Sequence, residues 1–343
     1  MQVNWQDFLT AQGILGAADD EQRNFGDIVA EVQAAATGNA LYELSHLGLL
    51  QVEGADATAF LQGQFTNDIK ALDGSNSQLA GYCNPKGRML ALFTAFAHHD
   101  HLHLQLDGRL REAILKRLRM YVMRSKVTLT DVSESVLRIA VSGPDSISAL
   151  EQLFGNVPQQ PGQLVSLEHG AVLRLAGDIP AFQIFSDAEH MPAIWQALGA
   201  THRPAGRNAW EWLQIQAGIP DVVPATQEAF VPQMLNLDAL DGISLTKGCY
   251  TGQEIVARTH YLGKVKRRTL PAHLASDSRP IPGTAVQDAA GNEAGMVVRS
   301  ARAPQGGHDV LVEVRLEAVD GGLSLQQQAL SLGTLPYALP SRD

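Results

Sequence analysis

Hydrophobic residues recur at different spacings along the chain, and each spacing predicts a different element. Residues 4–36 carry apolar side chains at helical spacing, so we expect helical structure there. Residues 41–52 are strand-like, and Asp56 can then cap a helix that runs to about Asp73. Gly63 lies among polar residues inside that helix, where it lowers helix propensity and indicates a close backbone contact.

The clearest turn signal is Asn84-Pro85-Lys86-Gly87, which lies between two apolar runs. Asparagine, proline and glycine each favour a backbone conformation that reverses the chain. We therefore expect an antiparallel hairpin over residues 79–93, with Lys86 and Arg88 at its tip.

A third strand, 102–106, follows this hairpin and alternates apolar residues with His101, His103 and Gln105. Together with the preceding His98-His99 pair, these histidines suggest a metal ion. The partner ligands expected at metal-binding spacing are missing, however, and a polar strand face explains the alternation. We expect no metal site.

Strands and helices alternate through residue 204, which is the pattern of an α+β fold with mainly antiparallel sheets. Asn208 can cap a further helix over residues 209–217, and Gly218 can end it. After about residue 262, short strand candidates between proline- and glycine-rich turns favour a small β-barrel or sandwich. The expected helices are 110–122, 143–154 and 192–198, and the expected strands are 126–130, 136–142, 171–175, 181–184, 268–271, 284–287, 295–299 and 310–315.

Composition narrows the class of protein. With 343 residues, 45% of them hydrophobic and 18% charged, the chain fits a globular protein of two or three domains. No apolar run reaches the roughly 20 residues of a membrane span, and the N-terminus lacks basic and apolar signal regions, so we expect a cytoplasmic protein without a membrane partner. Cys83 and Cys249 are far apart in sequence, which favours reduced thiols.

The net charge of −10 argues against direct DNA binding, yet the basic residues are clustered. One cluster runs from Lys86 to Lys126, and a second follows from Arg258 to Arg268. Such runs are usually solvated faces. If the two clusters meet in the fold, they would create a positive field for an anionic ligand.

The segment with the most chemistry is Lys247-Gly248-Cys249-Tyr250-Thr251-Gly252-Gln253-Glu254. A thiol acts as a nucleophile or soft ligand only as the thiolate, and Lys247 beside Cys249 would favour that form. Gly248 and Gly252 permit backbone conformations or contacts that a side chain would forbid. The alternative is that Cys249 is a small buried hydrophobic residue and the glycines serve a turn.

Several motifs together resemble one family, the bacterial folate-binding YgfZ proteins. These proteins are related to the glycine-cleavage aminomethyltransferase (T-protein) and to a mitochondrial iron-sulfur assembly factor. The resemblance covers residue 40 to the end of the chain, and the cysteine octapeptide is its most specific part. The other motifs are Gln62-Gly63-Gln64, Asn84-Pro85-Lys86-Gly87-Arg88, Ile215-Gln216-Ala217-Gly218-Ile219-Pro220, Phe230-Val231-Pro232-Gln233 with Asn236-Leu237, and Leu335-Pro336-Tyr337.

The resemblance implies a domain organisation and a function. Residues 1–40 would form a helical preamble, 41–260 two related α+β lobes, and 261–343 a β-barrel, arranged around a channel that holds tetrahydrofolate. The implied role is maintenance of iron-sulfur proteins and, through a radical iron-sulfur enzyme, tRNA modification. We expect a monomer whose partners are folate and iron-sulfur proteins.

The resemblance also implies site residues. Cys249 and Lys247 would carry the chemistry, within a loop that includes Tyr250, Gln253 and Glu254. Trp210 would stack on the folate ring, and basic residues near Lys86 and Arg258 would meet its glutamate carboxylates. The implied cofactor-binding positions are Trp210, Leu47, Gln216, Asn84, Lys86, Arg88 and Arg258.

Three departures from the family pattern bear on the reaction. T-proteins carry an acidic pair after the hairpin glycine, whereas the residues around Ala91 are apolar here, so a T-protein-like transferase loses its acid-base group. Gln216 replaces a family glutamate, and Leu47 replaces a family aromatic residue. Three hypotheses follow: a folate-dependent accessory factor for iron-sulfur proteins, an aminomethyl or one-carbon transferase, and a binding scaffold with a structural Cys249.

Overall fold

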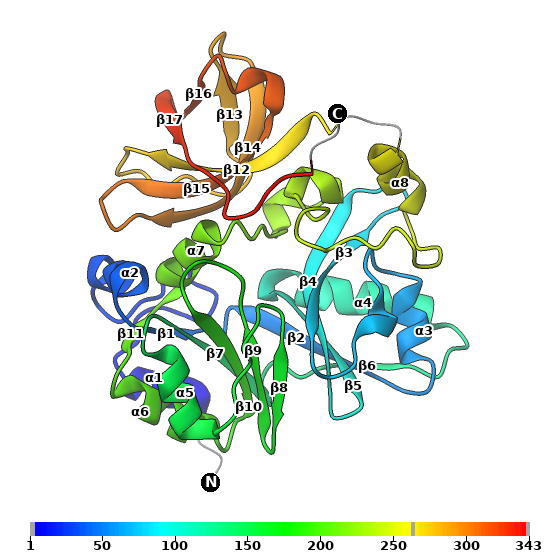
Figure 1. The fold of residues 1–343 in the computed structure, drawn as a ribbon, viewed down its shortest axis with the longest axis vertical. Coiled ribbons are helices and arrows are strands. Elements are labelled where there is room, and N and C mark those ends of the chain that lie inside the picture. The colour runs from blue at the N-terminus through cyan, green and yellow to red at the C-terminus, as the bar shows by residue number, and fades with distance from the viewer. Residues whose placement is uncertain (1–3, 262–264, 341–343) are drawn as a thin grey trace.

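Three parts make up the molecule: two lobes built on antiparallel sheets and a barrel. The computed structural model describes residues 4–261 and 265–340. Figure 1 shows the two lobes side by side, with the barrel packed across one end of them. This arrangement confirms the expected α+β class and decides between the barrel and the sandwich in favour of a closed barrel.

The first lobe is a five-stranded antiparallel sheet in the order β3-β4-β5-β2-β6. The predicted hairpin is its β3–β4 pair, and the predicted third strand is β5. Its strands are β2 (Leu47–Glu53), β3 (Ser77–Cys83), β4 (Met89–His98), β5 (His101–Asp107) and β6 (Thr128–Asp131), and its helices are α3 (Ala57–Gln62) and α4 (Arg111–Val122).

The second lobe is a six-stranded sheet in the order β11-β1-β7-β10-β9-β8, in which only the β1–β11 pair is parallel. Trp5 and Leu9 of the first helix pack into its core beside Trp195. Its strands are β1 (Ala40–Glu43), β7 (Val136–Ser142), β8 (Leu164–Leu167), β9 (Gly170–Arg174), β10 (Ala181–Asp187) and β11 (Arg203–Ala205), and its helices are α5 (Ser146–Phe154) and α6 (Met191–Gly199), with α1 (Trp5–Ala11) and α2 (Ile28–Thr37) beside them.

The third part is the closed barrel β12-β15-β14-β13-β16-β17. Alternate valines and leucines along its strands fill the interior, which is why the short strands close on themselves. Residues 262–264, where the sequence predicts the change of pattern, lie outside the described residues. The strands are β12 (Arg267–Leu274), β13 (Ala285–Asp288), β14 (Glu293–Arg302), β15 (His308–Arg315), β16 (Leu323–Leu325) and β17 (Gln328–Leu332).

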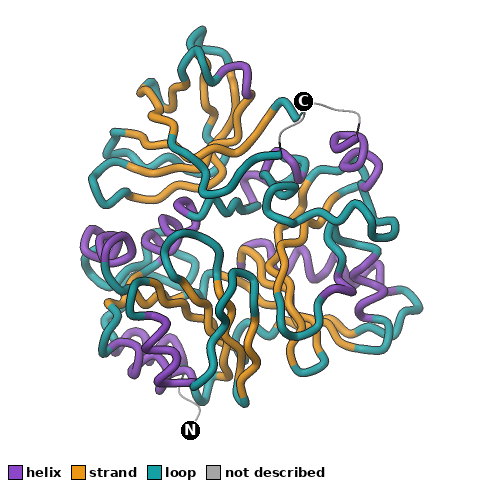
Figure 2. The backbone as a smooth tube through the Cα atoms, viewed as in Figure 1, coloured by secondary structure: helices purple, strands orange, loops and turns teal. Residues whose placement is uncertain are grey.

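Helix α7 (Arg207–Gln216) joins the second lobe to the barrel, since it packs against α2 and β1 on one side and β14 on the other. Its polar side chains are buried and paired: Glu211 forms an ion pair with Arg299 of the barrel, and Trp212 Nε1 donates to Asp309 over 2.9 Å. In Figure 2, loops run between the barrel and the two lobes, beside helix α7. Within the described residues, no helix combines the length and apolarity needed to cross a membrane.

Two predicted elements at the start of the chain are wrong in extent. The strand predicted over 41–52 is two strands, β1 and β2, which belong to different sheets because the chain turns at Leu44–His46 and passes between the lobes. The helix predicted to run to Asp73 ends at Gln62, with Gly63 as its C-cap. The helical structure expected over 4–36 is present as two helices, α1 and α2.

Candidate functional site

The hairpin tip and the cysteine loop lie against each other. Asn84 Oδ1 accepts from the backbone N–H groups of Lys86 and Arg88, at 2.9 and 3.1 Å, which closes the turn. A Cβ at Gly252 would lie 2.5 Å from the carbonyl oxygen of Asn84, and Gly252 has a φ of +84°. Glycine is therefore required at Gly252 both by the backbone conformation and by the close approach.

Lys247 is buried and attaches the cysteine loop to the segment after α3. Its Nζ donates to the carbonyl oxygens of Gln62, Phe65 and Asn67, at 2.7, 2.6 and 2.8 Å. An ammonium has three N–H donors, so these carbonyls use all of them. Burial lowers the pKa of Lys247 to about 8. The Gln62-Gly63-Gln64 motif and the octapeptide are thus parts of one contact.

Cys249 itself is exposed, as a reactive thiol must be, whereas Cys83 is buried. Desolvation raises the pKa of the Cys83 thiol to about 12, which keeps it protonated and inert. The alternative reading of Cys249 as a small buried residue is therefore wrong. Tyr250 is buried below the loop, and its ring centroid lies 5.0 Å from Lys247 Nζ.

Helix α8 (Gln253–Tyr261) begins directly after Gly252, so the segment that the sequence left open between helix and strand is a helix. Glu254 and Arg258 are exposed on it, and Lys86 is exposed on the hairpin tip. The start of the first basic cluster therefore lies beside α8, because Gly87 is packed against Ile255 of that helix. A Cβ atom added to Gly248 would have no neighbour within 4 Å, so packing gives no reason for a glycine at this position.

A cavity of about 500 Å³ lies between the two lobes, the end of α7 and the C-terminal tail. Its wall is mainly apolar, with Arg174 and Gln214 among its polar groups. Tyr337 closes one side, where its hydroxyl donates to the carbonyl of Gly218 over 2.7 Å. The terminal Leu335-Pro336-Tyr337 motif and the Gly218 motif therefore meet at this cavity.

One strap of chain connects the cavity to the cysteine loop. Residues 239–241 line the cavity, and the chain reaches Lys247 six residues later. The strap is fixed to the first lobe, because Asn67 Nδ2 donates to the carbonyl of Asp241 over 2.6 Å and Thr66 Oγ1 to that of Gly242 over 2.7 Å. A ligand in the cavity would therefore contact a segment that continues into the cysteine loop.

Three of the expected cofactor-binding residues lie elsewhere. Trp210 is 4% exposed and packs edge to face on Tyr42 in the core, and Leu47 is buried in the same core. Gln216 points to the barrel, where its Nε2 donates to Asp309 over 3.1 Å. Gln214, two residues earlier on α7, lines the cavity instead. The expectation that these three residues contact folate stays a prediction.

Sequence reasoning missed the residues that other segments bring to the cavity. Arg174 ends β9, Asp178 lies in the loop after it, and Asp241 belongs to the strap. None of them belongs to a local motif. Their role comes only from the packing of one lobe against the other.

Comparisons with known proteins agree with the geometry. The GCVT N-terminal domain model matches residues 6–241. The tRNA-modifying protein YgfZ of Colwellia psychrerythraea is 36% identical over 228 residues, covering 66% of this chain and 69% of that protein, and its namesake from Sodalis glossinidius is 34% identical over 227 residues, covering 66% and 69%. The aminomethyltransferase T of the Bartonella henselae glycine cleavage system superposes with a TM-score of 0.72 over 96% of this chain and 95% of its own, at 17% identity, which shows a shared fold.

Proposed function

The chain belongs to the YgfZ family, and on that basis we propose that it is a tetrahydrofolate-binding accessory protein for tRNA modification and iron-sulfur cluster assembly or repair. The cavity between the lobes is the observation that carries this proposal. Its volume of about 500 Å³ lies within the roughly 300–1,000 Å³ of small-molecule sites, and apolar walls with a few polar groups suit a flat heterocycle.

Arg174 supports the choice of an anionic ligand, because it lines the cavity and its guanidinium, which lies over the Phe182 ring at 4.9 Å, can pair with a carboxylate. Lys86 and Arg258 lie farther away. Asn84 of the hairpin tip is five residues beyond Leu79 of the cavity wall, or about 16 Å at strand spacing. In this proposal Arg174 and Gln214 hold the folate, and the tip cations meet the distal carboxylates of a longer glutamate tail.

Cys249 is the proposed functional thiol. It is exposed on a loop that is fixed on one side by Lys247 and on the other by the Gly252 contact. A cluster needs about four protein ligands, so one thiol acts on a cluster only together with a partner protein or other thiols. Leu90 and Ala91 are buried and apolar at the positions of the T-protein acids, which disfavours the transferase alternative.

Isothermal titration calorimetry of the full chain with tetrahydrofolate tests whether the chain binds this cofactor. We expect Arg174→Met to weaken binding about tenfold or more, since a hydrogen bond to a charged group contributes about 1.5–3 kcal/mol. Arg302→Met, which changes an exposed arginine on the barrel, is the matched control. Equal affinities of the two variants for tetrahydrofolate would refute the assignment of this cavity as the folate site.

The thiol is tested separately in cells. Iron-sulfur enzyme activities are compared in a deletion background complemented with the native chain or with Cys249→Ser. We expect the serine variant to fail to restore these activities although it binds tetrahydrofolate normally. Full complementation by Cys249→Ser would refute the role of the thiol and leave the folate site standing.

A further inference from the structure

Six of the eleven histidines of the chain gather where the two lobes face each other, far from α8 in Figure 1. His98, His99, His101 and His103 belong to the β4–β5 hairpin of the first lobe, and His169 lies in the β8–β9 turn of the second. These five line a cavity of about 240 Å³, and His98 Nδ1 lies 3.2 Å from Ser166 Oγ of the facing lobe. Residues of both lobes therefore line this cavity.

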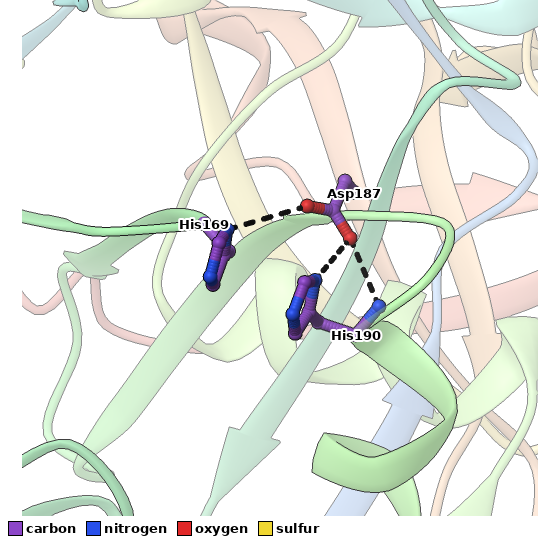
Figure 3. A group of neighbouring side chains, drawn as sticks. All are labelled: His169, Asp187 and His190. Atoms are coloured by element: carbon purple, nitrogen blue, oxygen red, sulfur yellow. Dashed lines mark hydrogen bonds and ion pairs between the residues drawn. The ribbon is translucent and has the colours of Figure 1, made fainter.

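Two histidines and one carboxylate form the centre of this group, as Figure 3 shows for His169, Asp187 and His190. One ligand atom from each residue lies within 4.8 Å of the others. His190 Nδ1 is 2.7 Å from Asp187 Oδ1, and His169 Nδ1 is 3.7 Å from Asp187 Oδ2. The two rings are stacked, with centroids 3.8 Å apart.

The backbone holds these residues together. Asp187 Oδ1 accepts from the N–H groups of Glu189 and His190, at 3.1 and 2.9 Å, which fixes the turn before α6. Ser186 Oγ and Asp187 N both donate to the carbonyl of His169, at 3.0 and 3.3 Å, which fixes the β8–β9 turn to the end of β10. Asp187 Oδ1 is therefore occupied, whereas Oδ2 points toward His169.

We propose that His169, Asp187 and His190 bind a divalent first-row transition metal ion. Two imidazoles and a carboxylate are a donor set that such ions take in proteins. Bonds of about 2.0–2.2 Å place tetrahedral ligand atoms about 3.4 Å apart, so the side chains must close in by about an ångström and the rings must turn apart. All three side chains are 40–47% exposed, so they are free to make this movement.

The facing hairpin supports the site. His103 is 5% exposed, and among the described residues its Nδ1 has no hydrogen-bond partner. A buried imidazole nitrogen without a partner therefore lines the same cavity as His169 and Asp187.

Calorimetric titration with Zn²⁺ tests the proposal. The full chain is stripped with a chelator and carries Cys249→Ser, so that the exposed thiol does not compete for zinc. We expect one zinc ion per chain, with the affinity reduced about tenfold or more in His169→Ala and in His190→Ala. Glu189→Gln removes an exposed neighbouring charge without removing a ligand and should bind zinc as tightly as the parent.

Cobalt provides a second measurement, because the visible absorption of bound Co²⁺ reports nitrogen and oxygen coordination. We expect the spectrum to be lost in the His169→Ala and His190→Ala double variant. Absence of zinc binding to the parent, or equal affinity in the parent and the double variant, would overturn the site. A loss of affinity in His98→Ala without one in His169→Ala would also overturn it, because the ion would then belong to the hairpin alone.

Discussion

Removal of the Lys247 ammonium is the sharpest test of how the cysteine loop is held. Lys247→Met keeps most of the side-chain volume and removes the donors to the carbonyls of Gln62, Phe65 and Asn67. The buried carbonyls then have no donor from residue 247. A buried polar group that loses its partner costs about 1–3 kcal/mol, so three such groups cost at least about 3 kcal/mol.

Urea unfolding of the full chain measures this loss. We expect the midpoint to fall with an unchanged m-value, because the surface exposed on unfolding stays the same. Lys70→Met is the matched control, since Lys70 is exposed on the same segment that Lys247 holds. A loss of stability in Lys247→Met no larger than that in the control, about 0.5 kcal/mol or less for a surface position, would refute the reasoning.

The same variant tests the predicted activation of Cys249. If the ammonium favours the thiolate, alkylation of Cys249 at neutral pH slows in folded Lys247→Met. If the rate stays the same, Lys247 only positions the loop. The rate is measured without denaturant, where the control and the variant are both folded.

Three further variants test neighbouring features. Gly252→Ala should lower the free energy of unfolding by about 1–2 kcal/mol for the left-handed backbone alone, and more from the contact with Asn84; unchanged urea stability would contradict the close approach. Tyr337→Phe should lower the free energy of unfolding by about 1 kcal/mol and weaken tetrahydrofolate binding, because it removes the hydroxyl that donates to the Gly218 carbonyl. Calorimetry that finds the affinity of the parent would show that the C-terminal tail does not contribute to the binding site. Burial raises the pKa of Asp221 to about 7. Between about pH 4 and 7 the native state therefore keeps a proton on this carboxyl group that the unfolded chain has released, so the free energy of unfolding should fall as the pH rises through this window. Asp221→Asn should lack this decline, and urea midpoints that change equally with pH in both proteins would refute it.

Local sequence patterns predicted the elements whose structure depends on local backbone preferences. The hairpin over 79–93 follows from its turn residues, and the barrel follows from short strands between glycine and proline turns. The octapeptide was predicted as a site because no hydrophobic period explains its glycines. Its Gly252 is indeed required by a positive φ, which is a local property.

Contacts between distant segments were beyond the reach of these patterns. The strand predicted over 41–52 divides between two sheets, because its pairing partners lie about 50 to 160 residues away. Lys247 was expected to act on the adjacent Cys249, yet its three donors are used by a segment about 180 residues earlier. The β4–β5 histidines also share a cavity wall with His169 and Asp187, which belong to the other lobe.

The sequence alone therefore determined most of the strands, turns and helices, and it singled out the short motif that carries Cys249. Only the tertiary structure decided what surrounds those motifs: the cavity between the lobes, the carbonyls around Lys247, and the meeting of His169, Asp187 and His190. The physical reason is the distance along the chain over which each kind of interaction acts. A backbone preference acts within a few residues, whereas a cavity wall or a ligand set depends on how separate surfaces pack against each other.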